Sequence, residues 1–277
     1  MVAGAPIRIA DADDPRIAAF RSIRERDLVG REGRFVAEGT VVLRMLAASH
    51  AADGRFRAES VLVLENRLAG IAGILDSLPA DVPVHVADRA VFNTIAGFDM
   101  HRGVVAIGRR EAAQAAGALI ASLPSDSLVL AGCGISNHDN MGSLFRNAAA
   151  FGVDAILLDE TCCDPLYRKA IRVSVGAVLS VPFTRGGSAQ GMLEGLSGAG
   201  FEIWALSPRG EAAIGSIVPS ERLALVAGTE GEGLPAAILS RFHTARVPQK
   251  PGLDSLNVAT ASGVALYQMA LAKGRIG

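Results

Sequence analysis

Six short, uninterrupted apolar runs in the second half of the chain constrain its fold more than any other feature. They are SLVLAG, DAILLD, VLSVPF, FEIWAL, LALVAG and HTARVP, which begin at Ser127, Asp154, Val178, Phe201, Leu223 and His243. Because the strands of a parallel sheet are covered on both faces, their sequences are continuously apolar rather than alternating. The runs therefore predict an α/β domain with a mostly parallel sheet, in which ligands bind beyond the carboxyl ends of the strands.

The first half of the chain shows a similar alternation on a smaller scale. Strands are predicted for RFVAEG, SVLVLE, PVHVA and GVVAIG, which begin at Arg34, Ser60, Pro83 and Gly103. Residues 14–27 fit a helix, because Ile17, Phe20 and Ile23 are three residues apart and follow an Asp-Pro start. This half is therefore predicted to be a small α/β domain of its own.

The length of 277 residues is about twice that of a usual domain, which supports a division in two. The Ala-rich stretch 109–126 ends in a proline break and is the predicted linker. The predicted organisation is a domain over 1–108, the linker over 109–126 and a second domain over 127–277.

The composition gives no sign of a membrane span or a disulfide framework. Half of the residues are hydrophobic, yet no apolar run approaches the roughly 18 residues that a span needs. The N-terminus lacks the basic-then-apolar layout of a signal peptide, so a cytoplasmic protein is expected. Cys133, Cys162 and Cys163 have no C-x-x-C spacing and are expected to be buried thiols, with no metal bound. The net charge of -1 does not by itself indicate a nucleic-acid binder.

Three loops that follow predicted strands carry the unusual residues. The first is NHDNMGSLFRNA over 137–148, which leads into a helix. We expect Asn140 to cap this helix and Gly142 to allow close backbone approach. Arg146 then lies within the first two turns. Taken alone, the segment also fits an ordinary capped helix with a surface arginine.

The second loop is AGTEGEGL over 227–234, where three glycines fall within six residues. This spacing favours a tight turn whose backbone N–H groups face a ligand. The acidic Glu230 and Glu232 make a phosphate an unsuitable ligand. No G-K-[ST] follows, so the loop matches neither a P-loop nor the dinucleotide fingerprint.

The third loop covers residues 247–257 and enters the C-terminal helix. Ser255 is a candidate N-cap for this helix. The helix then continues on small residues, which permit close packing: Ala259, Ala261, Gly263 and Ala265.

Together, the three loops closely resemble the signature motifs of the SpoU (TrmH-like) family of SPOUT RNA 2'-O-ribose methyltransferases. The residues that fall on the three motifs are Asn140, Gly142, Arg146 and Asn147; Gly228, Glu230, Gly231 and Gly233; and Pro248, Ser255, Leu256, Asn257 and Val258. Gln249 and Ala259 depart from the third motif, which has a hydrophobic residue and a serine there. The segment GRFVAEG at 33–39 is similar to the L30e-like substrate-binding domain that precedes the catalytic domain in many members.

The resemblance implies a C-terminal sheet with a deep trefoil knot, the cofactor S-adenosylmethionine and a homodimer. It implies cofactor contacts at Leu206, Gly228, Gly233, Val247 and Leu256. It implies catalytic or supporting roles for Arg146, Asn140, Glu230, Asn257 and Ser255. A guanidinium keeps its proton up to a pKa above about 12, so we expect Arg146 to stabilise a developing alkoxide rather than act as a base. The role of Glu230 stays open between stiffening the knot and positioning Arg146 or the nucleotide. The role of Ser255 stays open between capping the helix and contacting RNA or the cofactor.

The expected function is RNA ribose 2'-O-methylation, with large-subunit rRNA favoured by the L30e-like segment. A tRNA methyltransferase and a catalytically inactive RNA-binding or ribosome-assembly protein remain alternatives. A small-molecule α/β enzyme is disfavoured, because no phosphate-binding motif or acid-base pair is present. RNA contacts in the first domain are expected from Arg21, Arg24, Arg26, Arg31 and Arg34.

Overall fold

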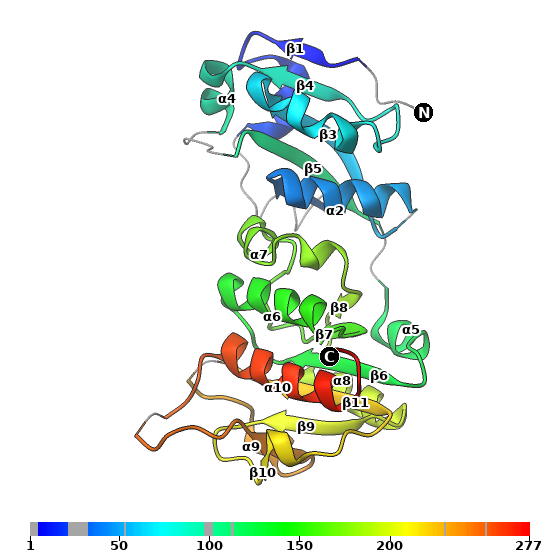
Figure 1. The fold of residues 1–277 in the computed structure, drawn as a ribbon, viewed down its shortest axis with the longest axis vertical. Helices are drawn as coiled ribbons and strands as arrows, with labels where there is room; N and C mark the ends of the chain where they lie inside the picture. Colours follow the sequence, from blue (N-terminus) through cyan, green and yellow to red (C-terminus); the bar gives the residue numbers. More distant parts are fainter. Residues whose placement is uncertain are drawn as a thin grey trace. The chain divides into compact units, whose positions relative to one another are not determined.

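The chain was analysed as a computed structural model (Figure 1). The structure describes residues 5–21, 33–52, 54–96, 102–111, 114–229, 231–252 and 254–277. The contacts divide the chain into two compact units, Met1–Ala112 with Leu166–Ser180, and Ala113–Pro165 with Val181–Gly277. Such a division does not establish which segments fold independently, so the domain bounds 1–108, 109–126 and 127–277 stay a prediction.

The first unit contains a five-stranded mixed sheet with the strand order β1-β4-β3-β5-β2. Its strands are β1 Ile7–Ile9, β2 Arg34–Glu38, β3 Phe56–Leu64, β4 Val84–Ala87 and β5 Val104–Arg110. β4 pairs in parallel with β1 and β3, whereas β5 pairs antiparallel with β2 and β3. The four predicted strands are confirmed, and β1 was not predicted. The similarity to an L30e-like domain stays a prediction.

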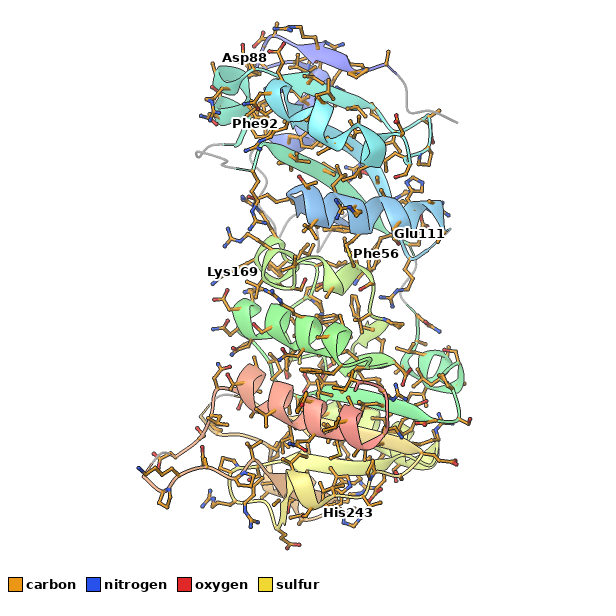
Figure 2. The ribbon with its side chains drawn as sticks, viewed as in Figure 1. Phe56, Asp88, Phe92, Glu111, Lys169 and His243 are labelled. Carbon is orange, nitrogen blue, oxygen red and sulfur yellow. The ribbon has the colours of Figure 1, made fainter. Side chains whose placement is uncertain are left out.

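Short helices complete the first unit. They are η1 Pro15–Phe20, α2 Thr40–Ala51, η3 Glu65–Arg67, η4 Ala69–Ile71, α3 Ala72–Leu75, α4 Arg89–Ala96, α7 Arg168–Val173 and η5 Ala177–Leu179. The predicted helix over 14–27 is a 3-10 turn capped by Asp14, and it ends at Phe20; residues 22–27 lie outside the described ranges. Asp88 Oδ1 accepts a hydrogen bond from Val91 N–H at 2.9 Å, and Phe92 is buried, as labelled in Figure 2.

The segment 166–180 is separated in sequence from the rest of the first unit but packs within it. Arg168 Nε and Nη2 donate to Glu38 Oε2 at 3.0 and 2.8 Å, so α7 is held to β2 by a largely buried ion pair. Glu38 belongs to the RFVAEG segment that the sequence singled out. Its carboxylate therefore has a structural role within this unit.

The second unit contains a seven-stranded sheet with the order β10-β12-β9-β11-β6-β7-β8. Its strands are β6 Ser127–Gly132, β7 Ala155–Leu158, β8 Phe183–Arg185, β9 Glu202–Leu206, β10 Ala212–Ala213, β11 Arg222–Ala227 and β12 His243–Arg246. Every described pairing in this sheet is parallel, which confirms the predicted α/β class. The run from Val178 forms a strand only from Phe183, because Val175 and Gly176 have positive φ and the chain forms the 3-10 turn η5.

Helices pack on both faces of this sheet (Figure 1). They are α5 Ala116–Ala121, α6 His138–Ala150, α8 Ala189–Gly198, η6 Ile214–Ser216, α9 Ala236–Leu239 and α10 Val258–Ala272. Residues of α5, α8 and α9 share one apolar core with the strands, whereas α6 packs against α10. The trefoil knot stays a prediction, because strand order and register alone do not trace how the chain is threaded. Among the described residues, no helix is long and apolar enough to cross a membrane.

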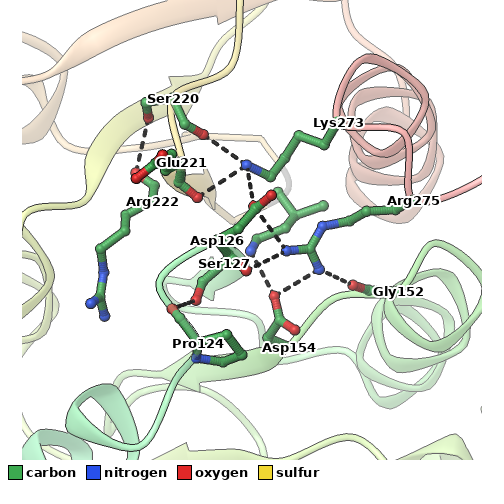
Figure 3. Close-up of polar contacts among 11 residues, drawn as sticks. Pro124, Asp126, Ser127, Gly152, Asp154, Ser220, Glu221, Arg222, Lys273 and Arg275 are labelled. Carbon is green, nitrogen blue, oxygen red and sulfur yellow. Dashed lines mark hydrogen bonds and ion pairs between the residues drawn. The ribbon is translucent and has the colours of Figure 1, made fainter.

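Two basic residues after α10 fasten the C-terminus to the amino ends of the strands (Figure 3). Lys273 Nζ forms an ion pair with Asp126 at 2.6 Å and donates to the carbonyls of Ser220 and Glu221. The Lys273 ammonium, with a smaller contribution from Arg275, lowers the pKa of Asp126. These contacts hold the C-terminal end of α10 at the amino ends of the strands, opposite the edge where the carboxyl ends of the strands lie.

Removing Arg275 from this cluster should destabilise the second unit. Its guanidinium donates to the Gly152 carbonyl and to Asp154 Oδ2, both at 2.7 Å, and its side chain is 17% exposed. We expect Arg275→Ala to lower the free energy of unfolding by about 2 kcal/mol, because partly buried acceptors lose a charged donor. Urea unfolding measures the change. Arg241→Ala, which breaks an exposed pair with Glu194, is the matched control and should cost less than about 1 kcal/mol; equal effects would contradict this account.

Candidate functional site

A cavity of about 730 Å³ lies at the carboxyl ends of β9, β11 and β12. Its walls come from the residues that follow these strands, as the parallel sheet predicted. All five residues expected to bind the cofactor line it: Leu206, Gly228, Gly233, Val247 and Leu256. Ser255 and Asn257 line the same cavity. Their roles stay predictions, but the structure brings these residues together around one space.

The glycine loop 228–234 forms one wall and has little freedom to change. A Cβ on Gly228 would lie 2.7 Å from the backbone carbon of Gly233 and from the nitrogen of Leu234. Thr229 and Gly233 form an antiparallel bridge, and Gly231 and Gly233 adopt positive φ. The backbone of the tight turn is therefore closely packed at this wall, which Thr229, Glu232 and Leu234 also line. Glu230 lies outside the described residues.

The structure corrects both predicted helix caps. Asn137, not Asn140, caps α6: its side chain accepts from the N–H groups of Asp139 and Asn140. Asn257, not Ser255, caps α10 by accepting from the N–H groups of Ala259 and Thr260. In each case a second residue with a capping side chain stands close in sequence, and the helix begins after Asn137 and Asn257 because their backbone is non-helical, with ψ of 122° and 141°.

A hydrogen bond joins the first and third motifs across 117 residues. Asn257 Nδ2 donates to Asn140 Oδ1 at 3.0 Å, and Asn140 is buried. The amide of Asn257 therefore has two functions, because its oxygen caps α10 while its nitrogen holds α6. Asn140 and Asn257, for which the resemblance implies catalytic or supporting roles, thus link α6 to α10, and the roles themselves stay predictions.

Asn147 makes a second link between α6 and α10 and was absent from the predicted site. Its Nδ2 donates to the Ala259 carbonyl at 2.8 Å. A Cβ on Gly263 would lie 2.8 Å from the same nitrogen, so the small residue makes room for the amide. The spacing of seven residues from Asn140 places both asparagines on one helix face and was the available signal.

Arg146 does not line the cavity of the single chain, and its side chain is exposed. At 100° per residue, Arg146 lies about 120° around α6 from Asn140 and about 100° from Asn147, which both face α10. The helix therefore presents this guanidinium to solvent. Its catalytic role stays a prediction.

Ser262 is a buried residue of the cavity wall that sequence analysis missed. It is completely buried, and its Oγ has no hydrogen-bond partner among the described residues. A buried hydroxyl without a partner is unfavourable, so a ligand atom in the cavity would satisfy it. The volume also lies within the range of small-molecule pockets, about 300 to 1,000 Å³. The residues present thus fit a cofactor of adenosyl size.

The three cysteines are free thiols, as expected. Cys133 and Cys162 are buried, whereas Cys163 is only partly buried, so the expectation of a buried thiol is wrong for that residue. Burial, followed by the charge of Asp159, raises the pKa of Cys133 to about 12. Burial likewise raises the pKa of Cys163 to about 11. Among the described residues, no group of His, Cys, Asp and Glu could hold a metal ion.

These raised pKa values predict unreactive thiols. Thiolate is the nucleophile, and at pH 8 the native protein should keep its cysteines protonated. We expect slow labelling by iodoacetamide in the native state and rapid labelling of all three after unfolding in urea. Mass spectrometry of the intact chain counts the adducts; rapid labelling of the native protein would contradict the assigned burial.

The first unit bears the arginines expected to contact RNA. Arg21 forms an ion pair with Asp13 at 2.6 Å, and Arg34 with Glu59 at 2.6 Å. Each of these charges is therefore partly neutralised by a neighbour. Arg24, Arg26 and Arg31 lie outside the described residues.

Residues 127–267 match the SpoU rRNA Methylase family. An uncharacterized tRNA/rRNA methyltransferase of Mycobacterium tuberculosis is 36% identical, over 97% of this chain and 93% of the relative. The 23S rRNA (guanosine-2'-O-)-methyltransferase RlmB of Escherichia coli is 30% identical, over 74% of this chain and 84% of the relative.

Solved structures extend the likeness to the whole fold. An RNA 2'-O ribose methyltransferase matches with a TM-score of 0.77 and 26% identity, over 98% of this chain and all of that one. An AdoMet-bound rRNA methyltransferase of Sinorhizobium meliloti matches with a TM-score of 0.79 and 22% identity, over 98% of both chains. The chain belongs to the SpoU methylase family, which confirms the resemblance inferred from the three motifs.

Proposed function

We propose that this chain transfers the methyl group of S-adenosylmethionine to a ribose 2'-hydroxyl of RNA. The observation that carries the proposal is that the loops after β9, β11 and β12, which include the second and third motifs, meet around one cavity beyond the carboxyl ends of these strands. The names of the relatives support the reaction, since one is a 2'-O-methyltransferase of rRNA and another was crystallised with AdoMet.

In this proposal the cavity binds the cofactor mostly through backbone. The glycine loop and the residues after β12 would enclose the adenosyl group, and the Ser262 hydroxyl would form a hydrogen bond with it. The cofactor supplies the electrophilic methyl group when it is bound. The chain orients that methyl group toward the ribose and excludes water from the inner cavity, which gives the reaction its geometry.

The ribose oxygen takes the methyl group as its bond to sulfur breaks, which leaves S-adenosylhomocysteine, and the hydroxyl proton passes to solvent. Arg146 stabilises the negative charge that develops on this oxygen. Since its side chain is exposed on α6 and absent from the cavity wall, one chain does not complete the site. We infer that a second copy supplies the missing part, in a homodimer. The support is the exposed apolar surface of α10 at Val264, Tyr267 and Leu271, which are 37%, 45% and 46% exposed.

Mixing two inactive variants tests this dimer. Arg146→Ala lacks the guanidinium, and Gly228→Ala binds the cofactor too weakly for transfer when the cofactor is kept at low concentration. If Arg146 acts across the interface, a mixture that exchanges subunits should recover up to about a quarter of wild-type activity, because half of the dimers are mixed and each keeps one of its two sites. Sedimentation would show the dimer; a monomer with full activity would contradict it.

The proposed substrate is large-subunit rRNA, with tRNA as the alternative. Transfer of labelled methyl groups to unmodified 23S rRNA, 16S rRNA and tRNA compares them directly, and transfer to tRNA alone would reject the rRNA proposal. Arg21, Arg24, Arg26, Arg31 and Arg34 are proposed to contact the RNA backbone, so binding should weaken with salt. The enzyme is proposed to work in the cytoplasm.

A further inference from the structure

The wall of the cavity carries both signs of charge. Its charged residues, among those described, are Arg209 after β9, Glu232 in the glycine loop and Asp254 before α10. All three are exposed, so they stand where the cavity opens rather than at its buried end near Ser262. A ligand that fills the cavity would therefore meet these charges with its outer end.

The guanidinium of Arg209 is available for a ligand. Within the described ranges it makes no hydrogen bond or ion pair, and only its backbone N–H is engaged, with Ser207 Oγ at 3.3 Å. Arg246 is different, because its Nη1 donates to the carbonyl of Gly210 at 2.7 Å and so supports the loop after β9. An arginine left without a partner beside a cavity is suited to bind a carboxylate or phosphate through two hydrogen bonds.

The neighbouring charges distinguish between these two anions. An RNA phosphate at Arg209 would also meet the repulsion of Glu232 and Asp254, which line the same cavity. An amino-acid group carries an ammonium and a carboxylate, and it meets charges of opposite sign for both. The mixed charge of the opening therefore favours a zwitterion over a polyanion.

We propose that Arg209 binds the α-carboxylate of the methionine part of S-adenosylmethionine, and that Glu232 or Asp254 faces its α-ammonium. This inference rests on the proposed function, since it concerns the same cofactor. It assigns Arg209 the role of a residue that selects the cofactor by its carboxylate. The adenosyl group would be held independently, by the inner part of the cavity.

Three non-reactive ligands separate these contributions in calorimetric titrations. S-Adenosylhomocysteine has the whole amino-acid group, its decarboxylated analogue lacks only the carboxylate, and 5'-methylthioadenosine lacks the carboxylate and the ammonium. The wild-type protein should bind S-adenosylhomocysteine roughly tenfold more tightly than the decarboxylated analogue. Arg209→Ala should remove that preference while binding the other two ligands as the wild type does.

Two further variants serve as controls. Arg209→Lys keeps a positive charge without the fork of two donors, and it should retain part of the preference. Arg241→Ala removes an exposed arginine that does not line the cavity, and it should retain all of it. RNA affinity should be the same for Arg209→Ala and wild type.

The outcomes distinguish this inference from the proposed function. If wild type binds S-adenosylhomocysteine and Arg209→Ala keeps the full preference for the carboxylate, the inference is wrong and the proposed function stands. If Arg209→Ala weakens RNA binding but not the carboxylate preference, Arg209 contacts phosphate and the inference is also wrong. If wild type binds none of the three adenosyl ligands, the proposed function is wrong, and the inference, which depends on it, is wrong as well.

Discussion

Arg146→Ala should lower the rate of methyl transfer at least about a hundredfold while leaving cofactor affinity unchanged. The loss is expected because a cation aimed at a developing oxyanion contributes mainly in the transition state. The affinity for the cofactor should be unchanged because Arg146 does not line the cavity. Single-turnover transfer to rRNA measures the rate, and titration with S-adenosylhomocysteine measures the affinity.

Arg146→Lys is the matched variant for this experiment. It keeps the charge but loses the planar fork, so we expect partial activity if electrostatic stabilisation is the main contribution. Alanine at Arg241, on the surface of the second unit, should leave the rate unchanged. Full turnover by Arg146→Ala would contradict the role assigned to this residue, whatever its effect on cofactor binding.

Gly228→Ala should weaken cofactor binding by about tenfold to a hundredfold and thereby abolish transfer at low cofactor concentration. The new methyl group would lie 2.7 Å from backbone atoms of Gly233 and Leu234, which cannot rotate away as a side chain can. The glycine loop must therefore shift, at a cost of about 1 to 3 kcal/mol. Calorimetric titration with S-adenosylhomocysteine measures the change in affinity.

Gly198→Ala provides the comparison for Gly228→Ala. Gly198 belongs to α8, and a Cβ there would meet no atom within 4 Å. Alanine favours a helix over glycine, so this variant should be as stable as wild type or slightly more stable. It should also bind the cofactor normally. Unchanged binding by Gly228→Ala would show that the loop is less rigid than its close contacts indicate.

Much of the second unit could be predicted from the sequence, because buried parallel strands leave a local pattern. The run from Ser127, for example, is apolar at nearly every position, and it forms β6 with all six residues buried. The strand predicted from Val178 was displaced to Phe183, since hydropathy alone does not distinguish a buried turn from a strand. The placement of residues 166–180 in the first unit also depends on a distant partner, Glu38.

Local sequence patterns also predicted only part of the candidate site. The motif resemblance predicted residues such as Gly228 and Leu256 as cofactor contacts, and the structure places them around one cavity. Ser262 was missed because a serine within a helix of small residues looks like ordinary packing until its hydroxyl is found buried without a partner. The two helix caps were misassigned because local sequence offers several side chains with the same capping chemistry.

The position of the transferred methyl group tests the central claim most directly. Unmodified rRNA would be incubated with the protein and methyl-labelled S-adenosylmethionine and then hydrolysed in alkali, which cleaves only after a free 2'-hydroxyl. The account predicts label in alkali-resistant dinucleotides with wild-type protein and almost none with Arg146→Ala. Label released in mononucleotides, which would mean methylation of a base, or equal labelling by both proteins, would contradict it.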